Sequence, residues 1–195
     1  KDADTIDVRN RHFPFDYRLN KHRSTWLDVP SRIQGGANKK EIQAIKSILE
    51  DFIVWAKNNQ PQKGANRDEP ECWEVALLSP YQAQRRGLRD MVRLLTGLRF
   101  ETRFDLRQMN PPTNVALTVN SSDRFQGQEA DIVVLSMRNG GRKGFLDSPN
   151  RMNVATTRAR EWRIIVGNYD YFSGEQKPNR GPKCKDPMLN AFAKA

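Results

Sequence analysis

Four short apolar runs separate the polar and amphipathic stretches of this chain. They are VALLS (75–79), VALTV (115–119), IVVLSM (132–137) and RIIVG (163–167). Continuous apolar runs of this length, without polar alternation, are typical of strands buried on both faces of a parallel sheet. Because helical patterns alternate with the runs, the sequence predicts an α/β fold in three layers, with a mostly parallel central sheet flanked by helices.

Further segments extend this pattern on both sides. A first strand is expected over STWLDV (24–29), and Asn38 followed by Glu41 has the spacing of a capping box that opens a helix ending near 55–58. A second helix is expected over about 82–95, with several arginines mainly away from its apolar side, and a third is expected to open at Asp147 or Ser148. The polar stretches 58–71 and 99–114 are expected to be loops.

The length of 195 residues suits one sizeable α/β domain. We expect an extended basic segment over 1–23, the folded lobe over 24–173, and a basic tail or linker over 174–195. The chain begins with Lys1 rather than Met, and we expect it to be part of a longer protein. No apolar run approaches the roughly 18 residues of a membrane span, so no membrane partner is expected.

Charge points to a polyanionic partner. Lys and Arg total 33 against 23 Asp and Glu, a net charge of +10, which favours nucleic acid, although a solvated basic surface would have the same composition. Cys72 and Cys184 form no CxxC pair, and His12 and His22 have no ligand-like neighbours. We therefore expect no metal site in this chain and an intracellular, reducing location, without distinguishing nucleus from cytoplasm.

Polar turns follow the apolar runs, and ligands bind where parallel strands end. NSSDRFQGQE (120–129) follows VALTV: its serines and Asn120 can hold phosphate oxygens, Gly127 allows close backbone approach, and Glu129 can accept hydrogen bonds from a ribose. A plain polar turn capped by Asp123 would account for the same residues. SPYQAQ (79–84) follows VALLS, and Tyr81 can stack on a base or serve as a partly buried spacer.

TTRARE (156–161) raises a similar alternative. Arg158 and Arg160 would suit the carboxyl end of a helix as solvated charges. A guanidinium held in a fixed position can instead neutralise the charge that develops on a transferring γ-phosphoryl group, as an arginine finger does. Spacing alone leaves both interpretations open.

Three of these segments, in order, resemble motifs of superfamily 1 helicases. SPYQAQ resembles motif IV, SSDRFQGQEADIVVLS resembles motif V, and SPNRMNVATTRARE resembles motif VI, while GANKKEIQAI is similar to the stretch that opens the first helix of the second motor lobe. The similarity covers roughly residues 24–170 and is to the branch that contains the nonsense-mediated-decay RNA helicase and senataxin. Three motifs in the correct order are far more specific than any one of them.

The resemblance implies a RecA-like C-terminal lobe of an ATP-dependent RNA or DNA helicase. Its nucleotide site would include Gly127, Glu129 and the finger Arg158, which we expect to converge on one pocket, with Gln126 coupling the nucleotide to the strand-binding turn. Arg151 and Asn153 would brace the motif VI loop. The single-strand track would be lined by Ser79, Pro80, Tyr81, Gln84, Asn120, Ser121 and Ser122. ATP and Mg²⁺ are the implied cofactors, and single-stranded RNA or DNA and an N-terminal RecA-like lobe of the same protein are the implied partners.

Departures from the family pattern limit what this chain can do. It contains no GxxxxGK[ST] and no acidic pair after a strand, so the Mg²⁺ ligands are expected on the N-terminal lobe and this lobe alone is not expected to hydrolyse ATP. The family's Gln-Tyr-Arg motif is missing, and Thr156 replaces a usual Leu in motif VI. The alternative is a degenerate helicase-like lobe that serves as a nucleic-acid-binding or protein scaffold. A Rossmann enzyme is a more distant alternative, but GxGxxG follows none of the strands.

Overall fold

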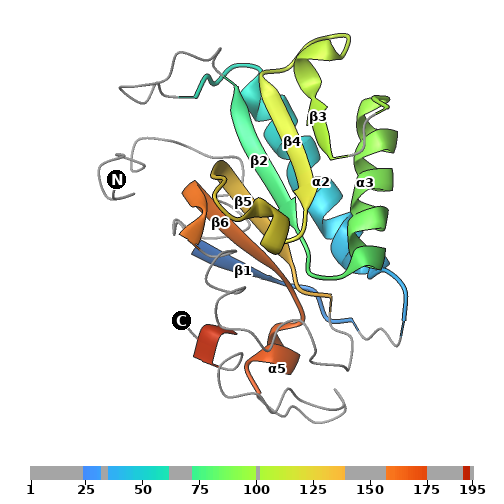
Figure 1. Cartoon of the computed structure of the whole chain (residues 1–195), viewed down its shortest axis with the longest axis vertical. Coiled ribbons are helices and arrows are strands. Elements are labelled where there is room, and N and C mark those ends of the chain that lie inside the picture. Colours follow the sequence, from blue (N-terminus) through green and yellow to red (C-terminus); the bar gives the residue numbers. More distant parts are fainter. Residues whose placement is uncertain are drawn as a thin grey trace.

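A computed structural model of the chain describes residues 24–31, 35–61, 72–99, 102–138, 157–174 and 191–193. Within these ranges one six-stranded sheet has the order β1-β6-β5-β2-β4-β3 (Figure 1). All pairs are parallel except β3 with β4. The strands are β1 (Ser24–Asp28), β2 (Trp73–Leu78), β3 (Arg103–Asp105), β4 (Val115–Asn120), β5 (Ala130–Ser136) and β6 (Ala159–Gly167).

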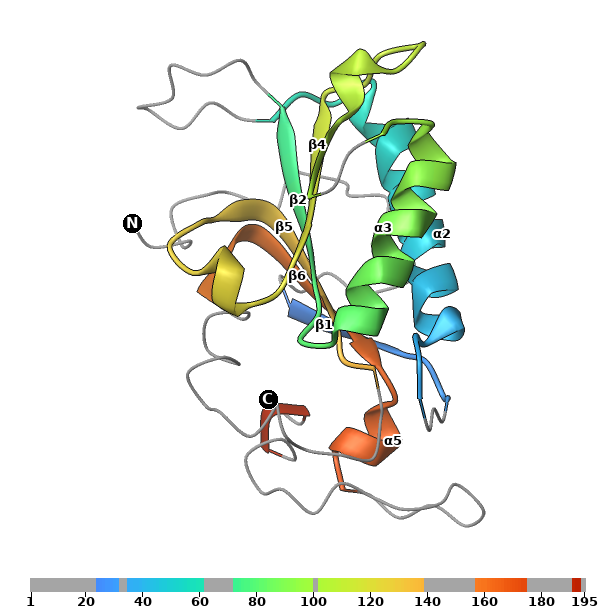
Figure 2. The same ribbon diagram turned by 45° about the vertical axis from the view of Figure 1, so that its right-hand side comes forward.

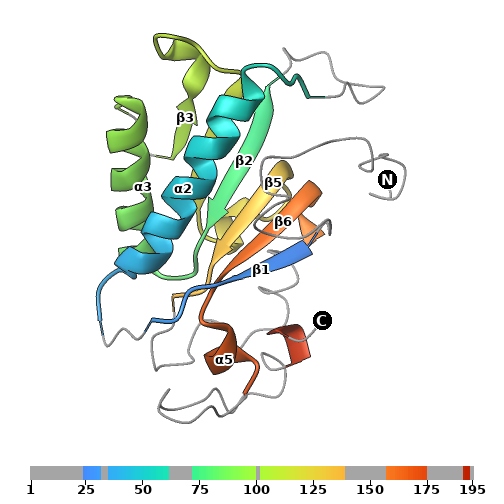
Figure 3. The ribbon, with the colours of Figure 1, turned by 180° about the vertical axis from the view of Figure 1, so that it is seen from behind.

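Two long helices cover one face of this sheet. Helices α2 (Lys39–Ala56) and α3 (Gln82–Thr96) lie side by side on the same face (Figures 2 and 3). Their apolar sides join the inward residues of β2, β4, β5 and β6 in one buried cluster that includes Phe52, Trp73 and Leu88. Burial of these side chains is the main favourable contribution to folding here. Helix α2 begins as predicted, because the Asn38 side chain accepts hydrogen bonds from the backbone of Lys40 and Glu41.

Shorter elements cover the opposite face. Phe125 in η4 (Asp123–Phe125), Phe172 in α5 (Tyr169–Phe172) and Ala193 are buried against β2, β5 and β6. Trp26 of β1 adds ring contacts with Tyr169 and Phe172, each at 5.8 Å between centroids. The sheet therefore lies between two covering layers, and the predicted three-layer α/β fold is confirmed.

The expected strands and the first two helices are present, with two corrections. The stretch expected to be a loop over 99–114 contains the edge strand β3 and the 3-10 turn η3 (Leu106–Gln108). Strand β6 begins at Ala159, earlier than the apolar run suggested, so Arg160 lies in the sheet rather than at a helix end. The expected helix at 147–148, Arg151, Asn153, residues 1–23 and most of 174–195 lie outside the described residues.

Candidate functional site

Motif IV and the start of motif V meet at the carboxyl edge of the sheet, by which we mean the side where the carboxyl ends of its parallel strands lie; the opposite side is the amino edge. Leu78, the last residue of β2, pairs with Asn120 of β4 and Leu135 of β5. The backbone N–H of Ser79 donates to the carbonyl of Asn120 at 3.1 Å. The turn that carries Pro80 and Tyr81 is therefore adjacent to Ser121 and Ser122.

Several polar side chains at this edge are turned into the protein. Ser79 and Gln84 are fully buried, and Ser121 and Ser122 are nearly so. Gln84 Oε1 accepts from the backbone N–H of Asn38 at 2.6 Å, and Gln84 Nε2 donates to Ser136 Oγ at 2.8 Å. Direct contact of the Ser79, Gln84, Ser121 and Ser122 side chains with nucleic acid, which the motif assignment implied, does not fit this burial. Pro80 is buried as well. Gln84 instead ties the start of α3 to α2 and β5.

A cluster of three arginines lies beside this edge: Arg85, Arg89 and Arg124. Arg85 Nη1 donates to the carbonyls of Ser79 and Pro80 at 2.9 and 2.8 Å, and Arg89 Nη2 donates to the carbonyl of Val119 at 3.1 Å. Burial lowers the pKa of Arg85, the charges of Arg89 and Arg124 lower it further, and the charge of Asp123 offsets part of this. Such crowding of like charges attracts an anion. Helical periodicity missed this cluster, because it predicted that these helix arginines lie mainly away from the core.

Glu129 and Arg158 are neighbours, but at the amino edge of the sheet. Glu129 directly precedes β5 and Arg158 directly precedes β6, and the N–H of Ala130 donates to the carbonyl of Arg158 at 3.0 Å. The expectation that the polar turns lie where parallel strands end is therefore wrong for Glu129, because motif V crosses the sheet before its strand begins. Glu129 is exposed and Arg158 half-buried.

Among the described residues, the nucleotide-site candidates at this edge include an unused hydrogen-bond donor and a turn beside open space. Arg158 Nε is buried without a hydrogen-bond partner among the described residues. Gly127 has φ +81°, and an added Cβ would meet no described atom within 4 Å. A left-handed glycine beside open space lets the backbone come close to a ligand. Gln126 is exposed on the same turn.

A small pocket of about 170 Å³ lies next to this turn. Glu129 lines it together with residues of β2, β3, β4 and motif V, but Arg158 is not among the lining residues. Glu129 and Arg158, which were expected to share a pocket, directly precede adjacent strands. Of the two, only Glu129 lines this pocket. Its lining residues are Glu74, Val75, Ala76, Arg103, Thr118, Phe125, Gln128, Glu129 and Ala130.

A set of ion pairs holds the strands together under these residues. Arg160 donates from Nε to Asp131 at 2.9 Å and from Nη2 to Glu74 at 2.7 Å. Asp131 also accepts from the backbone N–H of Glu74 at 2.8 Å. Burial alone would lower the pKa of Arg160, but the two carboxylates raise it. This set joins β2, β5 and β6 and was not predicted, since its members come from three distant segments.

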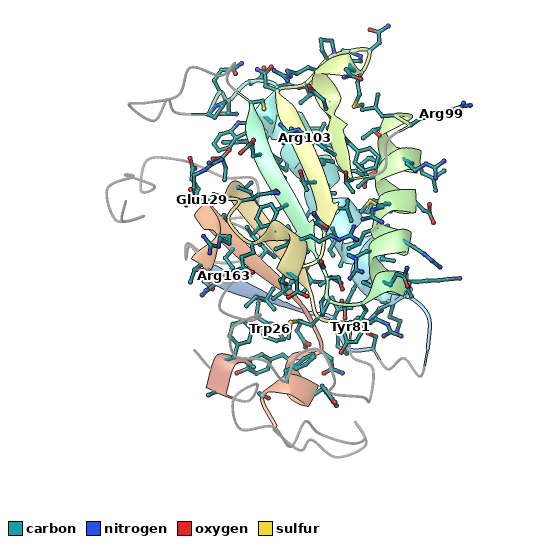
Figure 4. All side chains as sticks on the ribbon, viewed as in Figure 1. Trp26, Tyr81, Arg99, Arg103, Glu129 and Arg163 are labelled. Atoms are coloured by element: carbon teal, nitrogen blue, oxygen red, sulfur yellow. The ribbon has the colours of Figure 1, made fainter. Side chains whose placement is uncertain are left out.

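Residues 121–129 connect the two edges. They leave the carboxyl end of β4, cross the sheet face through the buried Phe125, and reach the amino end of β5. In Figure 4, Tyr81 and Glu129 lie at opposite edges of the sheet. In the described part of the chain no three His, Cys, Asp or Glu side chains form a metal-binding group, and no helix there is long and apolar enough to cross a membrane.

A protein family described as an AAA domain matches residues 6–170. The chain belongs to this family. Its curated relatives include the putative helicase MOV-10 of Gallus gallus, 28% identical over 76% of this chain and 15% of the relative. They also include the regulator of nonsense transcripts 1 homolog of Drosophila melanogaster, 32% identical over 53% of this chain and 8% of the relative. The probable helicase MAGATAMA 3 of Arabidopsis thaliana is 27% identical over 62% of this chain and 15% of the relative.

These matches confirm the resemblance to superfamily 1 helicases of the nonsense-mediated-decay branch. This AAA domain spans at most 15% of the length of those three relatives. Among solved structures, a Thermus phage large terminase ATPase domain aligns at TM-score 0.40 and 12% identity, over 92% of this chain and 75% of that one. The fold assignment rests on the sheet order and the two covering layers.

Proposed function

We propose that this AAA domain is the C-terminal motor lobe of an ATP-dependent superfamily 1 helicase or translocase that acts on single-stranded RNA or DNA inside the cell. The observation that carries the proposal is the course of motif V. One continuous segment, 121–129, begins beside the predicted strand-binding turn and ends with Glu129, next to Arg158. A motor lobe needs such a connection, because nucleotide state and grip on the track must change together.

The amino edge suits the nucleotide. The half-buried Arg158, the left-handed Gly127 and the exposed Glu129 are compatible with a phosphate and a ribose approaching from solvent. Bound ATP supplies the γ-phosphoryl group whose transfer to water drives the cycle. Arg158 would neutralise the charge that develops on that group, and Glu129 would accept a ribose hydroxyl. We expect the Mg²⁺ ligands and the phosphate loop on an N-terminal RecA-like lobe.

The carboxyl edge suits the nucleic acid. Tyr81 is half-buried and can present its ring, and Asn120, the last residue of β4, is half-buried as well. Pro80, Ser121 and Ser122 are buried, so they would contribute backbone groups rather than side chains to the track. The cluster of Arg85, Arg89 and Arg124 provides positive charge for phosphates at the same place. Contacts of this kind are tolerant of sequence and weaken with salt.

Closure of the two lobes would couple these edges. When the lobes close, Arg158 moves toward the phosphates, and the exposed Gln126 transmits the change along motif V to Ser121 and Ser122. Reopening would release the grip and move the strand by one step. The amino edge alone would lack the phosphate loop and the Mg²⁺ ligands, which are expected on the N-terminal lobe. This lobe by itself would therefore bind nucleic acid but not turn over ATP.

The first test is ATP turnover by the complete protein, with and without a single-stranded oligonucleotide. We expect turnover that the oligonucleotide stimulates, because the two edges are coupled. A complete protein that binds the oligonucleotide but shows no turnover under either condition would contradict the motor assignment and support a degenerate lobe that serves as a scaffold.

A further inference from the structure

Arg138 has a backbone conformation that is unfavourable for any residue with a Cβ. It follows β5 at the carboxyl edge of the sheet and has φ +40°, the one positive φ of a non-glycine residue in the described ranges. Glycine adopts this region freely, whereas other residues do so only where their surroundings hold them. Such positions cluster at functional sites.

A buried carboxylate holds the Arg138 backbone in place. Glu41 is fully buried at the start of α2, and its Oε2 accepts from the N–H of Arg138 at 3.0 Å and from Ser136 Oγ at 2.6 Å. In a capping box the carboxylate at the position of Glu41 accepts from the backbone N–H of the N-cap residue, here Asn38. That N–H donates instead to Gln84, which leaves Glu41 to reach the end of β5.

The Arg138 side chain is held in place, but some of its hydrogen-bond donors have no partner among the described residues. Its Nε donates to the carbonyl of Gly36 at 2.5 Å, and its guanidinium carbon lies 4.7 Å from the centre of the Tyr81 ring. Within the described residues its two terminal nitrogens have no hydrogen-bond partner, and the residue is only half-buried. A guanidinium held in this way can bind a phosphate through two parallel hydrogen bonds with little further loss of side-chain freedom.

We propose that Arg138 binds a phosphate of the single-stranded nucleic acid, with its guanidinium held by the Tyr81 ring and its backbone positioned by Glu41. The inference rests on the proposed function, since it takes the carboxyl edge of the sheet as the nucleic-acid side. It adds a residue outside those that motifs IV, V and VI assign to the track.

The substitution Arg138→Gly in the complete protein tests nucleic-acid binding while the fold is kept. Glycine accepts φ +40° without strain, which offsets the loss of the hydrogen bond to Gly36 and of the Tyr81 ring contact, so the thermal unfolding midpoint should change little, while the terminal donors are lost. We expect affinity for fluorescein-labelled oligouridylate or oligothymidylate to fall about tenfold. The slope of log affinity against log salt should become shallower by about one phosphate contact.

Arg99→Ala is the matched control. Arg99 is exposed and lies just beyond the carboxyl end of α3, whereas Tyr81 lies at the amino end of that helix (Figure 4). Arg99→Ala lowers the net charge by the same amount as Arg138→Gly. Unchanged affinity and slope in Arg138→Gly, equal losses in Arg99→Ala, or lost binding accompanied by a lowered unfolding midpoint would each overturn the assignment. A wild-type protein that binds neither oligonucleotide would contradict the proposed function itself.

Glu41→Gln tests the positioning role. The amide keeps the shape of the side chain but weakens its hold on the N–H of Arg138 and on Ser136. We expect weaker binding in Glu41→Gln, and no further loss when Glu41→Gln is added to Arg138→Gly. Additive losses in the double variant would show that Glu41 does not act through Arg138.

Discussion

Arg124 and Arg158 show how much a residue's role depends on its surroundings. Arg124 is exposed beside Ser121 at the carboxyl edge, while Arg158 is half-buried at the amino edge of the same sheet. Arg160, only two positions later, is committed to Asp131 and Glu74. The spacing within Thr-Arg-Ala-Arg left the roles of Arg158 and Arg160 open, because the partners of Arg160 lie 29 and 86 residues away. Only the resemblance to motif VI distinguished Arg158.

At this scale we predict a selective effect of Arg124→Ala on phosphate binding. The substitution removes one exposed charge from the cluster with Arg85 and Arg89 without breaking a side-chain hydrogen bond in the described structure. The salt slope of single-strand binding should become shallower by about one contact. Arg93→Ala on α3, whose charge pairs with Asp90, is the control. Equal slopes in Arg124→Ala and wild type would remove Arg124 from the track.

At the level of elements, the strands and long helices were predictable because hydrophobic periodicity depends on local sequence. The apolar runs became β2, β4, β5 and β6, and Asn38 opened α2 as expected. The edge strand β3 was missed, since RFD is too short to show a period. Which edge each motif occupies was also missed, because that depends on where the connection 121–129 crosses the sheet.

We predict that the Arg160 ion pairs contribute substantially to the stability of the sheet. Asp131→Ala would leave Arg160 with only Glu74 and would leave the N–H of Glu74 without its acceptor. The free energy of unfolding, measured by chemical denaturation, should fall by about 2–3 kcal/mol. The exposed Asp90→Ala should cost less than about 0.5 kcal/mol. Equal costs for the two variants would contradict a structural role for this set.

At the scale of the whole molecule, the lobe carries two functional edges joined by one segment. Phe125, within that segment, is buried against the sheet face. The family and the existence of motifs IV and V were predictable, because each is a short pattern of neighbouring residues. The arginine cluster, the left-handed Arg138 and the burial of Gln84 were not, because each results from packing between elements distant in sequence.

The most direct measurement of the central claim is ATP turnover by the Arg158→Ala variant of the complete protein, compared with wild type under single-strand stimulation. Arg158 directly precedes β6, its carbonyl accepts a hydrogen bond from the N–H that follows Glu129, and its side chain is half-buried. We predict a fall in turnover of at least about a hundredfold, with single-strand binding largely retained. Turnover equal to that of wild type would contradict the assignment of Arg158 as the arginine finger and, with it, the amino edge as the nucleotide site.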